Sequence, residues 1–203
     1  MDKLIYLVRH GDIDLGGDKR YIGQLDLPLS TLGVKQAAVL KEIFSRISLD
    51  KIYSSDLGRA QQTAKIVASA HSIIPAACAE LRELNMGDWE GKLFSEIKAK
   101  YPEKFRERGE DIANYSSPKG ESFADCYKRV IPIFERFVQA DETTILIVGH
   151  AGVNRVILCH VLGVALDNVF RFEQNYGCIN LISKKDSKYC LNFLNHTNNW
   201  SRS

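Results

Sequence analysis

Two histidines follow apolar runs of the sequence and could take part in phosphoryl or proton transfer. His10 comes soon after the run Leu4–Val8, and His150 follows Thr144–Val148. Continuous apolar runs of this length are typical of buried strands, and open α/β sheets bind ligands at the carboxyl ends of their strands. His150 also precedes a predicted helix, whose free N–H groups favour an anion such as phosphate. The two histidines therefore predict one phosphoryl-transfer site, although two unrelated polar strand ends would give the same pattern.

A cation stands at a comparable position. Arg59 lies in the first turn of a helix predicted over residues 57–70, after the short strand candidate Lys51–Tyr53. A guanidinium at that end opposes the helix dipole, which prefers a carboxylate there. The planar fork of arginine suits bidentate binding of phosphate. Arg59 is therefore a candidate phosphate ligand, and a solvated surface arginine is the alternative.

Carboxylates gather in the loop-like stretch Leu81–Gly91. Glu83, Asp88 and Glu90 all belong to it. Any one of them could serve as a general acid. Their spacing alone does not distinguish between them.

Strands and helices alternate along the chain and must position these residues. We expect strands at residues 4–8, 51–53, 73–76, 144–148, 178–183 and 189–194, and helices at 32–47, 57–70, 122–140 and 153–162. This order predicts a three-layer α/β fold with a mostly parallel sheet, helices on both faces and one antiparallel strand from the terminal hairpin around the polar turn 184–188. Pro132 should kink its helix. Residues of about 91–120 form either a short helical, lid-like insertion or a solvated excursion, and we expect one domain over 1–203.

Composition and charge exclude several classes of protein. The 203 residues include 27 Lys and Arg against 25 Asp and Glu, which is too balanced for a nucleic-acid or membrane-surface binder. The five cysteines are scattered, with no C-x-x-C pair, so free thiols in a reducing compartment fit better than disulfides or a zinc site. The N-terminal apolar run is too short for a signal peptide. We therefore expect a cytoplasmic protein with no metal or cofactor and with no membrane or nucleic-acid partner. These features do not decide whether the chain forms a homo-oligomer.

Five sequence blocks occur in one order and resemble a known family as a set. The blocks are Arg9-His10-Gly11, Ser54-Asp56-Leu57-Arg59-Ala60-Thr63, Leu81-Glu83-Gly87-Trp89-Glu90-Gly91, Pro118-Gly120-Glu121-Ser122 and Val148-Gly149-His150-Gly152. Together they resemble the histidine phosphatase superfamily, whose members have the phosphoglycerate-mutase-like fold. The stretch Leu81–Gly91 and the short insertion after it are most similar to the bacterial α-ribazole phosphatase branch.

The resemblance implies a role for each motif residue. His10 would attack phosphorus and become phosphohistidine, while Arg9, Arg59 and His150 surround the phosphoryl oxygens. Glu83 would protonate the leaving oxygen and then activate water. Nearby cations, including a charged His150, should lower the pKa of His10 and keep its imidazole neutral. The family needs no metal.

The resemblance also implies contacts to the organic part of the substrate. Arg20, Gly23 and Ala151 are the expected substrate contacts, although for Arg20 and Gly23 a structured loop is an equal alternative. The family usually carries a hydroxyl and an Asn at the positions that Ile13 and Gly16 occupy here. Two polar contacts to phosphate or substrate are therefore missing, so the resemblance does not fix the identity of the substrate.

Three functions compete at this point. The first is a phosphomonoesterase acting on a small molecule, with α-ribazole 5′-phosphate in cobalamin assembly as one candidate. The second is a phosphoglycerate mutase or a broad-specificity sugar and metabolite phosphatase, and the short, mixed-charge insertion favours hydrolysis over the mutase. The third is a non-catalytic phosphate-binding module, which the presence of all five expected catalytic residues disfavours.

Overall fold

Six strands form one mixed sheet in the computed structural model, which describes residues 2–186 and 188–197. The strands are β1 (Lys3–Arg9), β2 (Lys51–Ser55), β3 (Ala76–Cys78), β4 (Thr144–Gly149), β5 (Ile179–Lys185) and β6 (Lys188–His196), in the order β3-β2-β4-β1-β5-β6. Strand β1 is parallel to β4, β4 to β2 and β2 to β3, while β5 is antiparallel to both β1 and β6. Only β5 runs against the others, as predicted. One residue of the expected turn, Ser187, lies outside the described residues.

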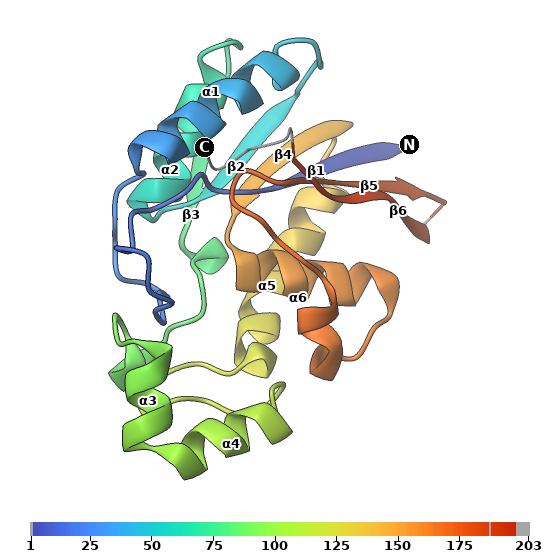
Figure 1. Cartoon of the computed structure of the whole chain (residues 1–203). Helices are drawn as coiled ribbons and strands as arrows, with labels where there is room; N and C mark the ends of the chain where they lie inside the picture. The colour runs from blue at the N-terminus through green and yellow to red at the C-terminus, as the bar shows by residue number, and fades with distance from the viewer. Residues whose placement is uncertain (1, 187, 198–203) are drawn as a thin grey trace.

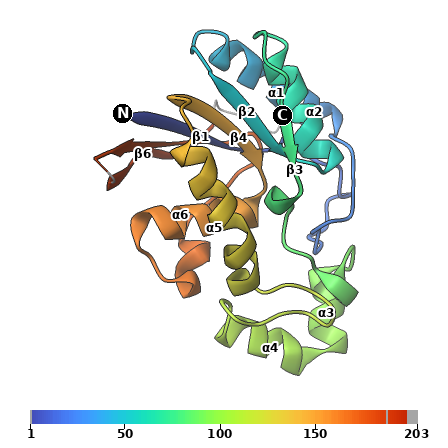
Figure 2. The same cartoon turned by 180° about the vertical axis from the view of Figure 1, so that it is seen from behind.

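Four longer helices cover both faces of the sheet. Helices α1 (Thr31–Phe44) and α2 (Gly58–Ala68) pack on one face, and α5 (Phe123–Gln139) and α6 (Ala151–Leu162) on the other, as Figures 1 and 2 show from opposite sides. The structure thus confirms the predicted three-layer α/β fold. None of the described helices has the length and apolar character needed to cross a membrane.

The apolar runs of the central strands are continuous because both faces of the sheet are covered. Ile145 and Ile147 of β4 point into the core under α5 and α6, whereas Leu146 and Val148 point into the core under α1 and α2. All four side chains are fully buried. Side chains alternate between the two faces of a strand, so a strand between two helical layers needs an apolar residue at every position.

Local chemistry fixes where α5 begins. The Ser122 hydroxyl accepts a hydrogen bond from the Asp125 backbone N–H at 3.1 Å, and the Asp125 carboxylate accepts one from the Ser122 N–H at 3.3 Å. This reciprocal pair satisfies two of the N–H groups that a helix start leaves free. Pro132 lies inside the helix, which continues past it to Gln139.

One strand is displaced from its predicted position. The run 73–76 was expected to form it, but β3 begins at Ala76, and Ile74 is 89% exposed. Three residues, from Ala76 to Cys78, pair with Tyr53–Ser55 of β2. Pairing with the neighbouring strand, rather than local hydropathy, therefore selects the residues of this edge strand.

The segment after residue 91 forms two short helices, α3 (Phe94–Lys100) and α4 (Pro102–Glu110). In both views they lie together at the end of the molecule opposite α1 and α2 (Figures 1 and 2). They pack around a small separate cluster of buried residues, Tyr21, Trp89 and Ile97. Three short 3₁₀ helices complete the described chain: η1 (Ala79–Leu81), η2 (Gly87–Trp89) and η3 (Leu166–Arg171).

Candidate active site

The two histidines of the sequence motifs meet at the carboxyl ends of β1 and β4. These strands are parallel neighbours in register, with Arg9 opposite Gly149. The His10 backbone N–H donates to the Gly149 carbonyl at 3.1 Å, and the ring centroids of His10 and His150 lie 5.0 Å apart. Both side chains are buried, with exposures of 3% and 0%. The parallel pairing thus brings together two residues that stand 140 positions apart in the sequence.

The hydrogen bonds of His10 define which ring nitrogen is free to react. Nδ1 lies 2.7 Å from the Gly11 carbonyl oxygen, which can only accept, so Nδ1 carries the proton. Nε2 then holds the lone pair and accepts a hydrogen bond from Nε of Arg59 at 3.2 Å. Burial lowers the pKa of His10 well below its usual range, and the charges of Arg9 and Arg59 lower it further. His10 is therefore a neutral imidazole with its lone pair facing the guanidinium.

His150 has no hydrogen-bond partner on either ring nitrogen among the described residues. Burial lowers its pKa well below the usual range, and His10, Arg59 and Arg9 add to the effect in that order. The expectation of a charged His150 is therefore wrong for this structure, because a buried imidazole among cations disfavours the proton. A neutral His150 can still donate one hydrogen bond to an anion.

Backbone carbonyls hold the Arg59 guanidinium in place. Its Nη1 donates to the Leu25 carbonyl at 2.8 Å and its Nη2 to the Gly23 carbonyl at 2.5 Å. The loop that offers these carbonyls is held in turn by Glu90, whose carboxylate accepts hydrogen bonds from the N–H groups of Gly23 (2.7 Å) and Gln24 (3.1 Å). The backbone at Gly23, expected to contact substrate, thus has its N–H bonded to Glu90 and its carbonyl bonded to Arg59. Sequence reasoning missed this positioning role of Glu90, which no local spacing signals.

Arg9 is oriented by residues near the start of β5. Its Nη1 donates to the Gln174 carbonyl at 2.6 Å, and its guanidinium carbon lies 3.6 Å from the centroid of the Tyr176 ring. The same ring lies 5.5 Å from the ring of His10. A guanidinium stacked on an aromatic face keeps its orientation while its charge stays available. Gln174 carries no motif and was not identified from the sequence.

Glu83 is the carboxylate that approaches the histidines. Its two side-chain oxygens accept hydrogen bonds from the N–H groups of Leu84 and of Gly152, each at 3.0 Å. Gly152 lies in the first turn of α6, directly after the His150 strand end. The Glu83 side chain is 8% exposed, whereas that of Asp88 is 48% exposed and that of Glu90 bonds to the 23–24 loop. Of the three carboxylates in Leu81–Gly91, only Glu83 therefore reaches the start of α6.

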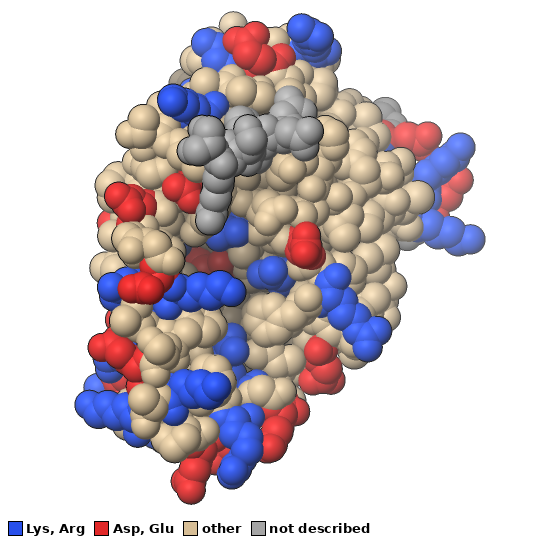
Figure 3. Space-filling model, in the orientation of Figure 1, with Lys and Arg blue, Asp and Glu red and all other residues tan. Residues whose placement is uncertain are grey.

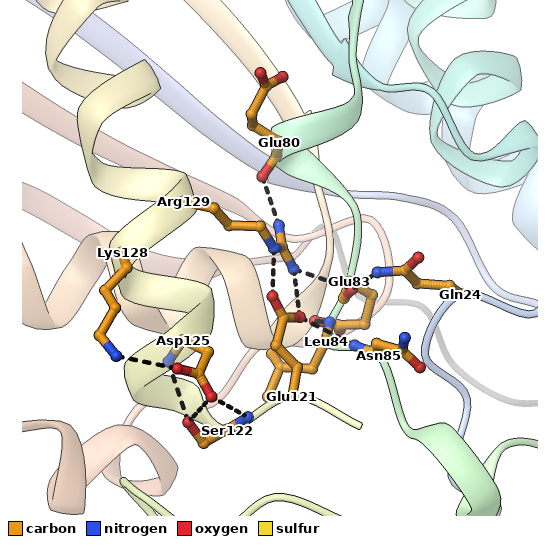
Figure 4. A network of polar contacts seen from close by, with 10 residues as sticks. All are labelled: Gln24, Glu80, Glu83, Leu84, Asn85, Glu121, Ser122, Asp125, Lys128 and Arg129. Carbon is orange, nitrogen blue, oxygen red and sulfur yellow. Dashed lines mark hydrogen bonds and ion pairs between the residues drawn. The ribbon is translucent and has the colours of Figure 1, made fainter. Parts of the chain in front are cut away.

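A network of polar contacts fixes the backbone of Glu83, as Figure 4 shows. Arg129 Nη2 and Gln24 Nε2 donate to the Glu83 carbonyl at 3.2 and 3.1 Å. Arg129 also makes two bonds to the Glu121 carboxylate, at 2.6 and 2.8 Å, and Glu121 accepts from the Asn85 N–H at 3.1 Å. The arginine of α5 and the glutamate before it thus clamp the segment that carries Glu83.

A cavity of about 990 Å³ opens beside Arg9 and Ala151. Figure 3 shows the hollow between the sheet and the α3–α4 end, with Lys and Arg atoms on its walls. Arg20 lines it, as do Asp12 and Asp14, and Arg20 also donates to the Gly91 carbonyl at 3.0 Å. A cavity of this size accommodates a metabolite-sized ligand.

The two departures from the family pattern have different surroundings. Ile13 is 4% exposed and lines the cavity, so it presents apolar surface where a hydroxyl is usual. Gly16 has a φ of +67°, and a Cβ added there would meet no other group within 4 Å. Another residue of the wall, Arg155 of α6, has no motif around it and was not identified from the sequence.

The fold and the arrangement of histidines and arginines define a class of α/β enzyme that handles phosphate groups at the carboxyl edge of its sheet. The sequence model of the histidine phosphatase superfamily (branch 1) matches residues 5–197, and the chain belongs to this family.

Two named relatives and one solved structure that the chain resembles are phosphatases. The chain is 35% identical to phosphoserine phosphatase 1 of Hydrogenobacter thermophilus, with 97% of this chain and 94% of the relative covered. It is 28% identical to the adenosylcobalamin/α-ribazole phosphatase of Escherichia coli, over 94% and 95% of the two chains. The solved structure of a mycobacterial glucosyl-3-phosphoglycerate phosphatase with VO3 superimposes with a TM-score of 0.88 at 26% identity, over 96% and 100%. The chain is accordingly a phosphatase.

Proposed function

We propose that the chain hydrolyses small phosphomonoesters through a covalent phosphohistidine at His10. The observation that carries this proposal is the state of the His10 ring. Nδ1 is held by the Gly11 carbonyl, so the lone pair is on Nε2, the nitrogen that faces Arg59. A neutral imidazole with its other nitrogen fixed is the form that can attack phosphorus.

The remaining residues support two half-reactions. In the first, Nε2 of His10 forms a bond to phosphorus, the ester P–O bond breaks, and a protonated Glu83 gives its proton to the leaving alcohol. In the second, water attacks phosphorus, Glu83 takes a proton from that water, and the P–N bond breaks to release phosphate. Arg9, Arg59 and His150 surround the phosphoryl oxygens and stabilise their charge in a loose transition state.

The proposal includes independence from metal ions, because arginines supply the positive charge that a divalent cation supplies elsewhere. Activity should therefore persist in EDTA. Complete loss in EDTA that a divalent ion restores would contradict this part of the proposal.

Trapping the intermediate tests the mechanism. Rapid quenching with a labelled phosphomonoester should give an acid-labile, base-stable phosphoryl group on His10 and stoichiometric release of the alcohol. His10→Ala should lose both the label and turnover, whereas His196→Ala, an exposed histidine of β6, should keep them. A label on a serine or an aspartate would refute the phosphohistidine.

A panel of phosphomonoesters identifies the preferred substrate. α-Ribazole 5′-phosphate and phosphoserine belong in it because relatives bear these names, and 3-phosphoglycerate tests the mutase alternative. We expect released phosphate with each accepted ester, with α-ribazole 5′-phosphate hydrolysed at a higher kcat/KM than 3-phosphoglycerate. Fast interconversion of 2- and 3-phosphoglycerate with little released phosphate would make the chain a mutase.

A further inference from the structure

Three buried carboxamides form a hydrogen-bonded network behind the proposed active site. Gln174 precedes β5, Asn180 is the second residue of β5, and Asn154 is the fourth residue of α6. Their exposed fractions are 3%, 0% and 0%. The Gln174 side-chain oxygen accepts from the amides of Asn154 and Asn180, each at 3.0 Å, and the Gln174 amide donates to the Asn180 oxygen at 2.8 Å. The network therefore joins α6 to β5 at the edge of the sheet that carries both histidines.

The network is anchored to β1 and β6. Asn180 Nδ2 donates to the Leu7 carbonyl of β1 at 2.9 Å, and Asn180 Oδ1 accepts from the Asn195 N–H of β6 at 2.9 Å. The Gln174 amide also donates to the Glu173 carbonyl at 2.8 Å. Every polar group of the Gln174 and Asn180 side chains thus has a partner, and an amide that is bonded on all sides keeps one orientation.

Gln174 begins a short segment that holds the end of β1. Its backbone carbonyl accepts from Arg9 Nη1 at 2.6 Å, and the ring of Tyr176 lies against the same guanidinium. The Gly177 N–H donates to the His10 carbonyl at 3.1 Å, and Gly177 has a φ of +67°, a conformation that favours glycine. One segment therefore holds both the guanidinium of Arg9 and the backbone of His10.

The Asn154 end of the network reaches the second histidine. The Asn154 N–H donates to the His150 carbonyl at 2.9 Å, as expected in the first turn of a helix. The Asn154 side-chain oxygen has no partner among the described residues, and a Cβ added at Gly149 would lie 3.0 Å from it. Asn154 therefore connects Gln174 to the backbone that carries His150.

Stability alone does not require buried amides at these positions. Replacing both partners of a buried hydrogen bond by apolar groups of the same shape is nearly neutral for stability. An apolar core of the right volume loses a unique geometry before it loses stability, whereas a bonded amide fixes its backbone. A cation that stabilises a transition state must be fixed before the substrate arrives. The network supplies this fixed geometry next to Arg9.

We propose that Gln174, held by Asn154 and Asn180, is a positioning residue for phosphoryl transfer and acts through Arg9. This inference rests on the proposed phosphatase function. The Gln174 side chain keeps the segment 174–178 in one geometry, so that its backbone carbonyl holds the Arg9 guanidinium where the phosphoryl oxygens arrive. Gln174 is 3% exposed and acts without touching the substrate.

Phosphate binding tests this positioning without turnover. Gln174→Met keeps most of the side-chain volume and removes the hydrogen bonds. Calorimetric titration with inorganic phosphate should give a Kd about 10-fold higher than that of the parent, as expected when a charged hydrogen bond to phosphate is weakened. Asn154→Leu removes one bond to the Gln174 oxygen and should raise the Kd by about 3-fold. Because it leaves the pair of Gln174 and Asn180 intact, Asn154→Leu decides the question if Gln174→Met does not fold.

Turnover gives a second readout. Gln174→Met should lower kcat/KM by about 10- to 100-fold, equally for alkyl and p-nitrophenyl phosphates, because Arg9 acts on the phosphoryl oxygens and not on the leaving group. In an Arg9→Ala background the same substitution should cost less than about 3-fold, since the residue through which it acts is absent. Additive losses in this cycle would overturn the proposal. Absence of turnover in the parent would refute the proposed function, whereas the phosphate titration would still decide the role of Gln174.

Tyr189→Phe is the matched control for loss of stability. The Tyr189 hydroxyl donates to the Glu135 carboxylate at 2.7 Å, and Tyr189 pairs with Lys184, at the other end of β5 from Ile179 and the proposed site. This variant should lower the melting temperature and leave the Kd for phosphate unchanged. If Gln174→Met likewise lowers the melting temperature but keeps the phosphate Kd and the kcat/KM of the parent, Gln174 only stabilises the fold and the proposal is overturned.

Discussion

Nε of Arg59 donates a hydrogen bond to Nε2 of His10 over 3.2 Å, so the proposed nucleophile accepts from the proposed phosphate ligand. The other two nitrogens of Arg59 are held by the carbonyls of Gly23 and Leu25. The guanidinium therefore keeps its place without help from a substrate. Such preorganisation is what makes a fixed charge effective in a transition state.

Arg59→Lys should reduce kcat/KM for phosphomonoesters by about 10²–10³-fold, because one ammonium cannot replace a fork that bonds His10 and two carbonyls. Steady-state release of phosphate measures the effect. Arg46→Lys, an exposed arginine beyond α1, is the control and should change little. A loss smaller than about 3-fold in Arg59→Lys would mean that this guanidinium does not contact the transition state.

The pH dependence of kcat/KM should report the neutral state of His10. Burial and the charges of Arg9 and Arg59 lower its pKa below the ordinary value of 6.5. Activity should therefore persist as the pH falls below 6.5 and decline only when His10 takes up a proton. Arg59→Gln removes one of these charges, so the pKa of His10 should rise and the acid limb of the normalised profile should move to higher pH. An acid limb that stays in place or moves lower would contradict this assignment.

When an alkyl phosphate is the substrate, Glu83→Gln should slow the phosphorylation of His10 by about 10²–10⁴-fold. With p-nitrophenyl phosphate the rate should fall much less, because p-nitrophenolate leaves without a proton. Since Glu83 should also activate water, p-nitrophenyl phosphate should give a burst followed by slow turnover. Asp88→Asn is the control, since the Asp88 side chain is half exposed and its one recorded partner among the described side chains is Lys119. Equal slowing for both leaving groups in Glu83→Gln would mean that another carboxylate is the acid.

Glu90→Gln should behave differently from both Glu83→Gln and Asp88→Asn. Its carboxylate holds the N–H groups of Gly23 and Gln24, and the Gly23 carbonyl holds Arg59. Loosening this loop should slow phosphorylation by alkyl and p-nitrophenyl phosphates to the same extent, without a burst. A selective effect on alkyl phosphates would move the acid role to Glu90.

Arg129→Gln should lower the free energy of unfolding by about 3 kcal/mol, because it leaves the largely buried Glu121 carboxylate without its partner. Urea unfolding measures this change. Lys128→Gln, next in the chain and paired with Asp125 at the surface, should stay within about 1 kcal/mol of the parent. Figure 4 shows both pairs. If Arg129 also positions Glu83, Arg129→Gln should slow the hydrolysis of alkyl phosphates more than that of p-nitrophenyl phosphate. Equal slowing of both substrates would mean that Arg129 only stabilises the fold.

Much of the fold was predictable because the sheet is covered on both faces. The runs Leu4–Val8 and Thr144–Val148 are apolar at every position, which is what a central strand between two helical layers requires. Histidines at the ends of such strands then had to lie at the ligand-binding edge. The edge strand β3 was displaced, because three residues with partial burial carry little hydropathy signal.

The sequence by itself determined the central strands, the four longer helices and the positions of His10 and His150 at strand ends, since these depend on local periodicity. Only the tertiary structure separated Glu83 from Glu90, because their roles depend on contacts with Gly152 and with the 23–24 loop, which lie far away in the chain. It also revealed Arg155, a residue that looks like any polar position of an amphipathic helix until the cavity beside it is known. Long-range packing decides which side chains share a site, and no local pattern encodes it.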